Sequence, residues 1–399
     1  MRDRAPRITY ISGPANVRRA YNEWMSNQAK DFFGTDYMKQ FFDLAESLGA
    51  ESHVVSWLAG EHFVERVGRF TFENRPMQNR HGLAYHLGMI VWFLKVLVSV
   101  VRFRPDVVVL TGNQNMWWML APARWLGAKF IVSYHCVLYA KFRPIRRTEK
   151  ILIALNEWLV LRYAAAIVMT SHDIRVQVEA LLGDRAASVP MLDHLPTYQP
   201  AQFAGIALPH RTMRWPFHIL FVGRVEENKG VFDMIEVSRR LATARPGHYK
   251  WDLCGSGGKL DAVRSRVGDL GLADAVTVHG HCGPDKLREL LGSAHVCVVP
   301  TRSSFEAGFE MTCAEAILAG RPLVTSAVCP ALHYLRPATI EVPPDDIDAY
   351  EEALIRLSED DQLYRRLQGA TGPLKDQFFD DRNSWYVAML AAIRQHGIS

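Results

Sequence analysis

Residues 304–324, SFEAGFEMTCAEAILAGRPLV, lie between two β-branched runs, HVCVVPT (295–301) and RPLVTSA (321–327). The flanking runs predict short buried strands, and the apolar segment between them predicts a helix near residues 311–319. Two strands joined by a helix form the repeating unit of a parallel sheet with helices on its faces. The segment therefore predicts an α/β fold.

The same pattern continues on both sides of this segment. Further strands are predicted at residues 7–12, 51–57, 106–112, 129–135, 165–171, 217–224, 250–257 and 275–281, with helical stretches between them. The pattern stops between residues 190 and 212, which hold four prolines and little periodicity, and then it begins again. We therefore expect two doubly wound, Rossmann-like domains at residues 1–195 and 213–375, a linker at 196–212, and a ligand in the cleft between the domains.

Length and composition agree with this division. A chain of 399 residues is too long for one ordinary core, and 49% hydrophobic with 22% charged residues is typical of a soluble globular protein. The formal net charge of +4 is small for this length, and no basic tract with interleaved aromatics is present, so we expect no nucleic-acid partner. The N-terminal residues lack the apolar core of a secretory signal, which indicates a cytoplasmic location.

The six cysteines show no C-x-x-C spacing, and several of them lie within apolar runs. Buried free thiols in a reducing compartment are the expected state. Residues 83–101, LAYHLGMIVWFLKVLVSVV, are long and apolar enough to resemble a membrane span, but Lys95 lies among them and a buried strand follows. A helix packed on a sheet is expected here, and a helix at a membrane interface is the alternative.

Two cations follow the strand at residues 217–224. Arg224 and Lys229 flank a turn that begins after Gly223 and leads into a helix. A guanidinium and an ammonium close to a helix N-terminus form a site suited to a diphosphate. The alternative is a pair of solvated charges that face Glu226 and Glu227.

A glycine-rich turn follows the strand at residues 250–257. Gly255, Gly257 and Gly258 allow the backbone to approach either a phosphate or another strand closely. The turn matches neither a Walker motif nor a complete G-x-G-x-x-G, so both possibilities remain open.

Three acids accompany the Gly308-Phe309 turn of the first segment, namely Glu306, Glu310 and Glu315. A carboxylate such as that of Glu315 can accept two hydrogen bonds from a vicinal diol such as a ribose. Backbone N–H groups near Gly308, Phe309 and Glu310 could meanwhile hold a phosphate or a sugar hydroxyl. The alternative is that acids in a first helical turn gain about 0.3–1 kcal/mol from the helix dipole alone.

The cations, the glycine turn and Glu315 each follow a strand of the same half, so they face one edge of the cleft. In this combination, residues 215–330 resemble the donor domain of retaining glycosyltransferases of the GT-B fold, family 4. That family pairs a G-R…K-G sequence after the first strand of the donor domain with a later E-x7-E motif. The resemblance implies that residues 376–399 form a helix that packs back on the N-terminal domain.

By position, the resemblance implies that Arg224 and Lys229 neutralise a nucleotide diphosphate and that Glu315 binds the nucleotide ribose. The first glutamate of the motif holds the donor sugar in the family, and here that position is Ala307. Either Glu306, one residue earlier, reaches the sugar, or backbone amides of residues 308–310 take over this contact, or the donor site is altered.

In the first half the resemblance is architectural. Ser12-Gly13-Pro14 occupies the loop that faces the diphosphate in the family, which makes Gly13 a donor-site candidate. His135 lies where the family often has a histidine near the reacting sugar. His172 and Asp173, after the strand at residues 165–171, are weaker candidates.

The resemblance implies a retaining glycosyltransferase that uses a UDP- or GDP-linked sugar, with no metal and no other cofactor. The acceptor is expected to be a glycan or a lipid-linked molecule that binds the first half, near the apolar helix and Arg143, Arg146 and Arg147. Peripheral association with the inner face of a membrane would follow. The alternatives are a nucleotide-sugar epimerase or phosphorylase, and a non-catalytic subunit that binds a sugar nucleotide, which Ala307 favours.

Overall fold

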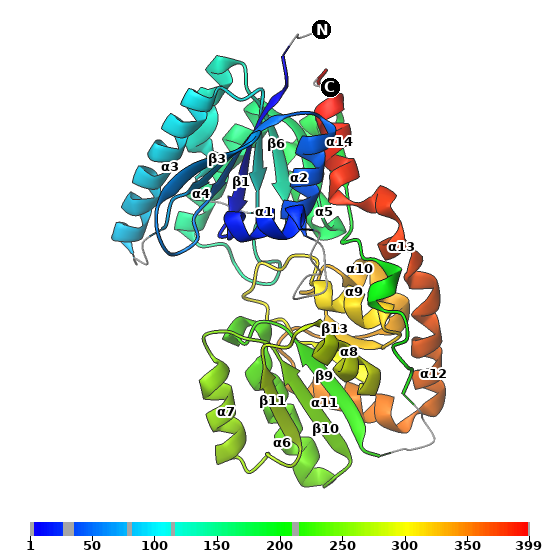
Figure 1. The fold of residues 1–399 in the computed structure, drawn as a ribbon. Helices are drawn as coiled ribbons and strands as arrows, with labels where there is room; N and C mark the ends of the chain where they lie inside the picture. Colours follow the sequence, from blue (N-terminus) through cyan, green and yellow to red (C-terminus); the bar gives the residue numbers. More distant parts are fainter. Residues whose placement is uncertain (1–3, 27–35, 78–81, 113–115, 210–214, 398–399) are drawn as a thin grey trace.

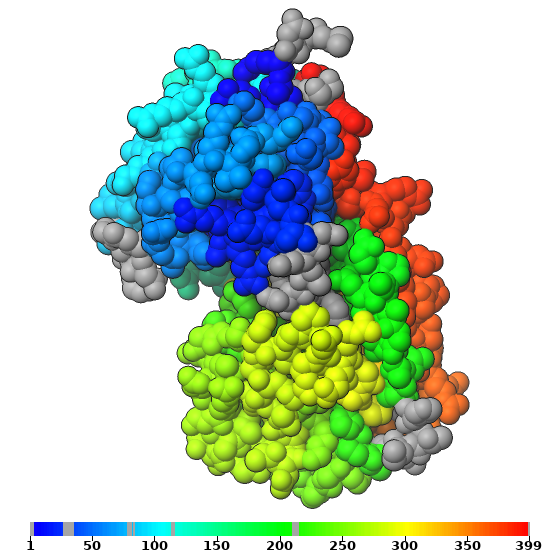
Figure 2. All heavy atoms as spheres, viewed as in Figure 1, coloured from blue at the N-terminus to red at the C-terminus, as the bar shows by residue number. Residues whose placement is uncertain are grey.

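The predicted β-branched runs form strands of two separate sheets, one in each lobe of the molecule (Figure 1). Figure 2 shows the two lobes in space-filling form. The computed structural model describes residues 4–26, 36–77, 82–112, 116–209 and 215–397. The expectation of an α/β fold with two doubly wound domains is confirmed. The residue limits of the domains remain a prediction.

The N-terminal sheet has eight strands in the order β3-β4-β2-β1-β5-β6-β7-β8, and all neighbours are parallel except β3 and β4. Central positions alternate between the two faces: Val107 and Val109 join one core, and Val108 and Leu110 join the other. The strands are β1 (Arg7–Gly13), β2 (Glu51–Ser56), β3 (Phe63–Val67), β4 (Phe70–Asn74), β5 (Val107–Thr111), β6 (Lys129–Tyr134), β7 (Ala164–Met169) and β8 (Met191–Asp193).

Helices cover both faces of this sheet. One face carries α1 (Val17–Met25), α2 (Tyr37–Ser47) and the C-terminal α14 (Trp385–Arg394). The other carries α3 (Leu83–Phe103), η1 (Trp117–Leu126), α4 (Arg147–Tyr163) and α5 (His172–Leu182), with η2 (Gly183–Ser188) leading into β8.

The C-terminal sheet has six parallel strands in the order β11-β10-β9-β12-β13-β14. They are β9 (Phe217–Val222), β10 (Tyr249–Cys254), β11 (Val276–Gly280), β12 (Val296–Val299), β13 (Leu323–Ser326) and β14 (Thr339–Val342). One face packs against α6 (Val231–Ala244), α7 (Leu260–Asp269), α11 (Ile347–Glu359) and α12 (Asp361–Ala370). The other packs against α8 (Pro284–Ser293), α9 (Met311–Leu318), α10 (Leu332–Leu335) and α13 (Asp376–Phe379).

Short 3₁₀ turns complete the connections: η3 (Pro200–Gln202), η4 (Glu227–Lys229), η5 (Arg336–Ala338), η6 (Gly372–Leu374) and η7 (Asp381–Asn383).

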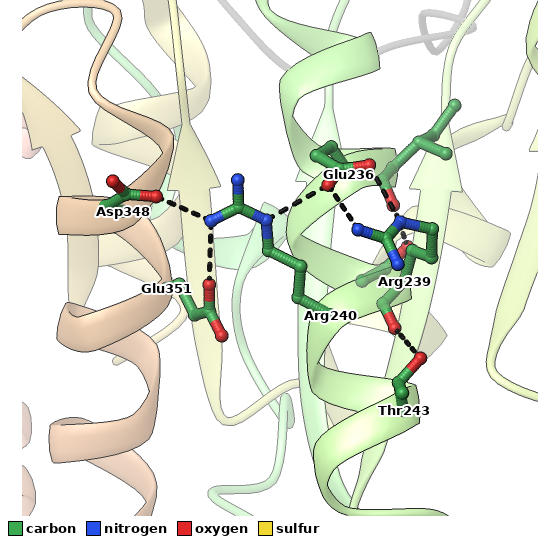
Figure 3. A network of polar contacts seen from close by, with 8 residues as sticks. Glu236, Arg239, Arg240, Thr243, Asp348 and Glu351 are labelled. Carbon is green, nitrogen blue, oxygen red and sulfur yellow. Dashed lines mark hydrogen bonds and ion pairs between the residues drawn. The ribbon is translucent and has the colours of Figure 1, made fainter.

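An ion-pair network fastens α11 to α6 on the outer face of the second sheet (Figure 3). Arg240 of α6 bonds Glu236 on its own helix at 3.0 Å and reaches Asp348 and Glu351 of α11 at 2.5 and 3.2 Å. Hydrogen bonds from Arg239 and Arg240 lower the pKa of Glu236 to about 2. Because these groups are largely solvated, the network orients the helices more than it stabilises them.

The last helix returns to the N-terminal lobe, as the family resemblance implies. Helices α12, α13 and α14 run along one side of the molecule from the C-terminal lobe to the N-terminal lobe (Figure 1). Trp385 of α14 is fully buried in the N-terminal core, and its indole Nε1 donates to Ser133 Oγ of β6 at 2.8 Å. The chain end therefore holds the two lobes together.

The apolar helix at residues 83–101 packs on the sheet through only one of its faces. In α3, a stripe that includes Trp92, Phe93 and Val96 is buried in the core. The opposite face leaves Leu87, Val91 and Leu94 at 63%, 51% and 48% exposure. In the described part of the chain, α3 is the single helix long and apolar enough to cross a membrane. The packed helix is thus found, but with an uncovered apolar side.

The expectation of free thiols is wrong for two of the six cysteines. The end of β10 and the segment after β11 lie side by side, which brings Cys254 and Cys282 to a Cα–Cα distance of 6.1 Å, and they form a disulfide. Cys136, Cys297, Cys313 and Cys329 are free, and the last three are buried. Sequence spacing gave no sign of the pair because 28 residues separate its members.

Candidate functional site

The two lobes touch directly between the β6–α4 connection and the loop that precedes α9. Cys136 forms a β-bridge with Gly308, and the Val137 N–H donates to the Ala307 carbonyl at 3.0 Å. A Cβ on Gly308 would lie 2.5 Å from the His135 carbonyl oxygen, so only glycine permits this approach. The turn that opens the 304–324 segment is therefore part of the domain contact.

A cavity of about 400 Å³ lies beside this contact, at the carboxyl ends of strands from both sheets. The N-terminal lobe contributes Tyr37, His135 and Thr170 to its wall. The C-terminal lobe contributes, among others, the predicted site residues Gly223, Arg224, Lys229, Gly308, Phe309 and Glu310. Such a position between two doubly wound domains is where this architecture binds its ligands.

Two cations share one aromatic neighbour in the cavity wall. The Lys229 ammonium lies 4.0 Å and the Arg224 guanidinium 5.5 Å from the centroid of the Phe305 ring. Lys229 is buried at the end of η4 and forms an ion pair of 2.7 Å with Glu310, whereas Arg224 is exposed. The two cations expected from the sequence therefore lie close together, and both contact the Phe305 ring.

His135 lies at the end of β6 and faces the cavity from the other lobe. Burial lowers the pKa of its imidazole to about 4, so the ring is neutral at pH 7. Its Nε2 is 3.1 Å from Ser133 Oγ, which accepts the indole N–H of Trp385. The C-terminal helix thus orients this histidine through one serine.

Glu315 lies in the second turn of α9, deeper than expected for an acid at a helix start. Its side chain is buried, and burial raises the pKa of the carboxyl to about 7, while a hydrogen bond with Tyr198 acts in the opposite direction. The helix dipole favours acids only in the first turn of a helix, so it does not explain an acid in the second turn. The carboxyl does not line the cavity wall as the described residues form it.

The remaining predicted donor residues also lie outside the cavity wall formed by the described residues. Gly255 and Gly257 pack on the loop after β9: a Cβ on them would lie 1.8 Å from the Gly223 carbonyl oxygen and 2.4 Å from that of Val225. Gly13 has a φ of +88° and lies next to Trp57. Of the two possibilities left open for the glycine turn, the structure supports the close approach of another backbone segment.

Glu306 is not among the described residues that line the cavity. It lies close to Cys136 of the other lobe, where its charge helps burial to raise the pKa of that thiol. Ala307, at the position of the first motif glutamate, is buried at the domain contact. Among the described residues of the wall, Glu310 is the one carboxylate.

The weaker candidates His172 and Asp173 lie at a second contact between the lobes. The His172 ring stacks on that of His333 of α10 with a centroid distance of 4.0 Å, and Asp173 pairs with Lys141 at 3.4 Å. Neither residue is among those that line the cavity in the described chain.

Sequence reasoning missed Tyr37, Thr170 and Phe305. Tyr37 is the first residue of α2, and its ring packs edge-on against His135 with centroids 4.2 Å apart. Thr170 follows β7, so its position at a strand end was a usable signal. Phe305 lies inside the first quoted segment, but nothing in its local pattern indicates contact with cations that precede it by more than 70 residues.

Comparisons with known proteins agree with this geometry. Residues 39–191 match the "Glycosyl transferase 4-like domain" model and residues 215–371 match the "Glycosyl transferases group 1" model, which together cover most of the chain. The chain belongs to the family 4, group 1 type of GT-B glycosyltransferases.

A curated relative, the 2-deoxystreptamine N-acetyl-D-glucosaminyltransferase of Streptomyces fradiae, is 24% identical over 306 residues, which are 71% of this chain and 70% of the relative. Sucrose-phosphate synthase from Thermosynechococcus elongatus superposes with a TM-score of 0.70 at 16% identity, over 98% of this chain and 99% of that one. HepE of Anabaena, solved with UDP, has a TM-score of 0.64 at 15% identity over the same shares. The two structures show that the fold is GT-B, and the family models show that this glycosyltransferase acts on sugar donors.

Proposed function

We propose that this glycosyltransferase moves a sugar, with retention of the anomeric configuration, from a UDP- or GDP-linked donor to a hydroxyl of a glycan or lipid-linked acceptor. One observation carries the proposal. Arg224 and Lys229 of one lobe and His135 of the other converge on a single cavity between the lobes. The UDP bound to the neighbour HepE supports a nucleoside diphosphate as the ligand type.

The residues suggest how the reaction would be assisted. As the bond from the anomeric carbon to the diphosphate breaks, negative charge grows on the phosphate oxygen, and Arg224 and Lys229 would stabilise it in the role that a metal has elsewhere. The acceptor oxygen attacks from the same face, and its proton passes to the departing phosphate. His135, neutral at pH 7, would bind a sugar hydroxyl and would not act as the general base.

Arg224→Ala is expected to weaken donor binding and turnover by about 10- to 100-fold, because a charge-assisted contact to phosphate is lost. A panel of UDP- and GDP-sugars would be screened by thermal shift, donor hydrolysis and transfer to acceptor. Arg266→Ala on the exposed side of α7 removes an equal charge and should leave every reading unchanged. A donor that binds without any transfer product would favour a non-catalytic subunit, and interconversion of the free donor would favour an epimerase.

The acceptor side of the proposal rests on the uncovered face of α3. This face continues over η1, which packs against both α3 and α4. Trp125 is 86% exposed, and Ile151 and Trp158 of α4 are 63% and 48% exposed. Figure 1 shows α3 at the outer edge of the N-terminal lobe, opposite α14. Exposed apolar surface of this extent in one place is typical of an interaction site.

The charges on the same surface favour an anionic membrane. Neither α3 nor η1 contains an acid, and Lys95, Arg102 and Arg124 lie on them. Arg146 and Arg147 are exposed at the start of α4, whereas Arg143 is paired with Glu149 at 3.1 Å. We propose that this surface rests on anionic lipid at the inner face of the membrane, where a lipid-linked acceptor would be presented.

Changing both Val91 and Leu94 to Glu is expected to reduce binding to vesicles that contain phosphatidylglycerol by at least about 10-fold, because each side chain loses its burial in lipid. Co-sedimentation would be compared with pure phosphatidylcholine vesicles and at raised salt. Val64→Glu, on the exposed strand β3 of the same lobe, is the matched control and should bind like the parent. Equal binding by the double variant and the parent would exclude this surface as the membrane contact.

A further inference from the structure

Glu310 has an unusual backbone conformation for a glutamate. It is the N-cap of α9 with φ 60° and ψ 77°, in the left-handed region that disfavours every residue with a Cβ. Its carboxylate nevertheless reaches Lys229, 81 residues earlier in the chain, at 2.7 Å. Both side chains are close to 90% buried, at 12% and 11% exposure.

Stability alone does not account for this pair. A buried ion pair seldom gains more from the attraction than it loses by leaving water, and the left-handed backbone adds a further cost. The pair lies in the wall of the donor cavity, and the ammonium concerned is the one placed to meet a diphosphate. The energetic cost of the buried pair is explained if Lys229 and Glu310 each contact a ligand when one is bound.

A diphosphate that reaches Lys229 must compete with the carboxylate of Glu310. The incoming anion and the carboxylate repel each other, so binding of one releases the other from the ammonium. The released carboxylate would still line the cavity that Arg224 and Lys229 also line, so it would be available to a sugar attached to the diphosphate. Glu306 and Ala307, the two positions considered from the sequence, are not among the described residues that line this cavity, and Ala307 lies at the domain contact.

We propose that Glu310 is the residue that recognises the donor sugar, accepting hydrogen bonds from its hydroxyls after the diphosphate has displaced it from Lys229. The inference rests on the proposed function and deepens it. Lys229 exchanges the Glu310 carboxylate for the diphosphate, and the carboxylate exchanges the Lys229 ammonium for the hydroxyls of the sugar. The ion pair with Lys229 keeps both side chains at the cavity wall, and the two charges cancel each other.

Glu310→Gln separates the two roles. Without the competing charge on Lys229, affinity for the nucleoside diphosphate alone should rise by about 3- to 10-fold, whereas the extra affinity that the sugar provides should fall by about 10-fold and kcat/KM by about 10- to 100-fold. Calorimetric titration with UDP, GDP and the corresponding sugars, together with transfer rates, gives these values. Glu227→Gln removes an exposed acid from the same turn as Lys229 and should change none of them.

Glu310→Gly provides a second variant that relieves the left-handed backbone and should fold as well as the parent. It should show the same opposite changes in diphosphate and sugar binding. Equal losses for both ligands in these variants would mean a purely structural role and would overturn the inference. So would a loss of sugar discrimination in Glu306→Gln with none in Glu310→Gln.

The parent protein tells this inference apart from the proposal on which it rests. If the parent transfers sugar and the Glu310 variants still distinguish the donor sugar as the parent does, the inference about Glu310 is wrong and the proposed function stands. A parent that binds no nucleoside diphosphate and no nucleotide sugar defeats the proposed function, and the role of Glu310 with it.

Discussion

Glu315→Gln should make the protein more stable above neutral pH and at the same time weaken its hold on the donor. The Glu315 carboxyl is buried in α9, and burial raises its pKa to about 7 from the value of 4.5 that it has in water. The folded state therefore binds this proton more tightly than the unfolded state. The stability that the protonated carboxyl contributes is complete below pH 4.5 and is lost as the pH rises to about 7.

The loss is roughly 3 kcal/mol at pH 8, since each unit of pKa shift corresponds to about 1.4 kcal/mol. Glutamine has the same shape without the charge, so the variant should match the parent at pH 4 and exceed it by this amount at pH 8. Urea unfolding at several pH values measures the difference. Glu352→Gln, an exposed acid on α11, is the control and should follow the parent at every pH.

Affinity for the donor should fall in the same variant. If Glu315 binds the ribose diol as the family resemblance implies, an amide in its place accepts weaker hydrogen bonds, and nucleotide affinity should fall by about 10-fold at pH 8. A variant that gains stability at pH 8 and keeps the parent's nucleotide affinity would leave Glu315 without a role in the donor site.

The order of strands and helices could be predicted because local patterns determine it. The helix expected near residues 311–319 matches α9 within one residue, and helices also fill stretches that the sequence predicts between other strands, such as α6 and α8. The antiparallel strand β3 was missed because its side chains are half exposed and include Glu65 and Arg66, which weakens the apolar pattern of a strand. The turn at Gly68 between β3 and β4 was a usable signal for this hairpin.

The cations of the candidate site could be predicted because they follow strand ends in one half of the chain. Glu310 was a predicted donor-site residue as well, but the ion pair between its side chain and Lys229 could not be predicted, because it depends on the path of the loop before α9. That path is set by the domain contact, where Gly308 meets Cys136 from the other lobe. A motif compared by spacing alone directs attention to Glu306, whereas the folded loop brings Glu310 to Lys229.

The link from Trp385 through Ser133 to His135 was beyond sequence reasoning for the same reason. Its members are 252 and 2 residues apart along the chain, and only the return of α14 to the first sheet brings them together. The position of His135 at a strand end was enough to predict it as a site residue. The sequence did not show that its ring is buried, which lowers the pKa of the imidazole and keeps it neutral.

Gly255 is the position at which a single methyl group should do most damage to the fold. Its φ of +151° is almost exclusive to glycine, and a Cβ there would lie 1.8 Å from the Gly223 carbonyl oxygen. Backbone hydrogen bonds from Gly223 N–H to the Cys254 carbonyl, at 3.0 Å, and from Val225 N–H to the Ser256 carbonyl, at 2.9 Å, hold the two loops in contact. The contact fixes the segment that carries Arg224 into the cavity.

Gly255→Ala should therefore lower the free energy of unfolding by roughly 3–5 kcal/mol, the sum of backbone strain and a forced displacement of the neighbouring loop. Gly268→Ala is the matched control, because Gly268 is exposed in α7 with nothing within 4 Å of a new Cβ, and alanine there should stabilise by up to about 1 kcal/mol. Urea unfolding of both variants, with nucleotide titration of each folded protein, separates packing from ligand contact. If Gly255→Ala is as stable as the parent and has lost only nucleotide binding, the glycine turn serves the phosphate directly and the packing explanation is wrong.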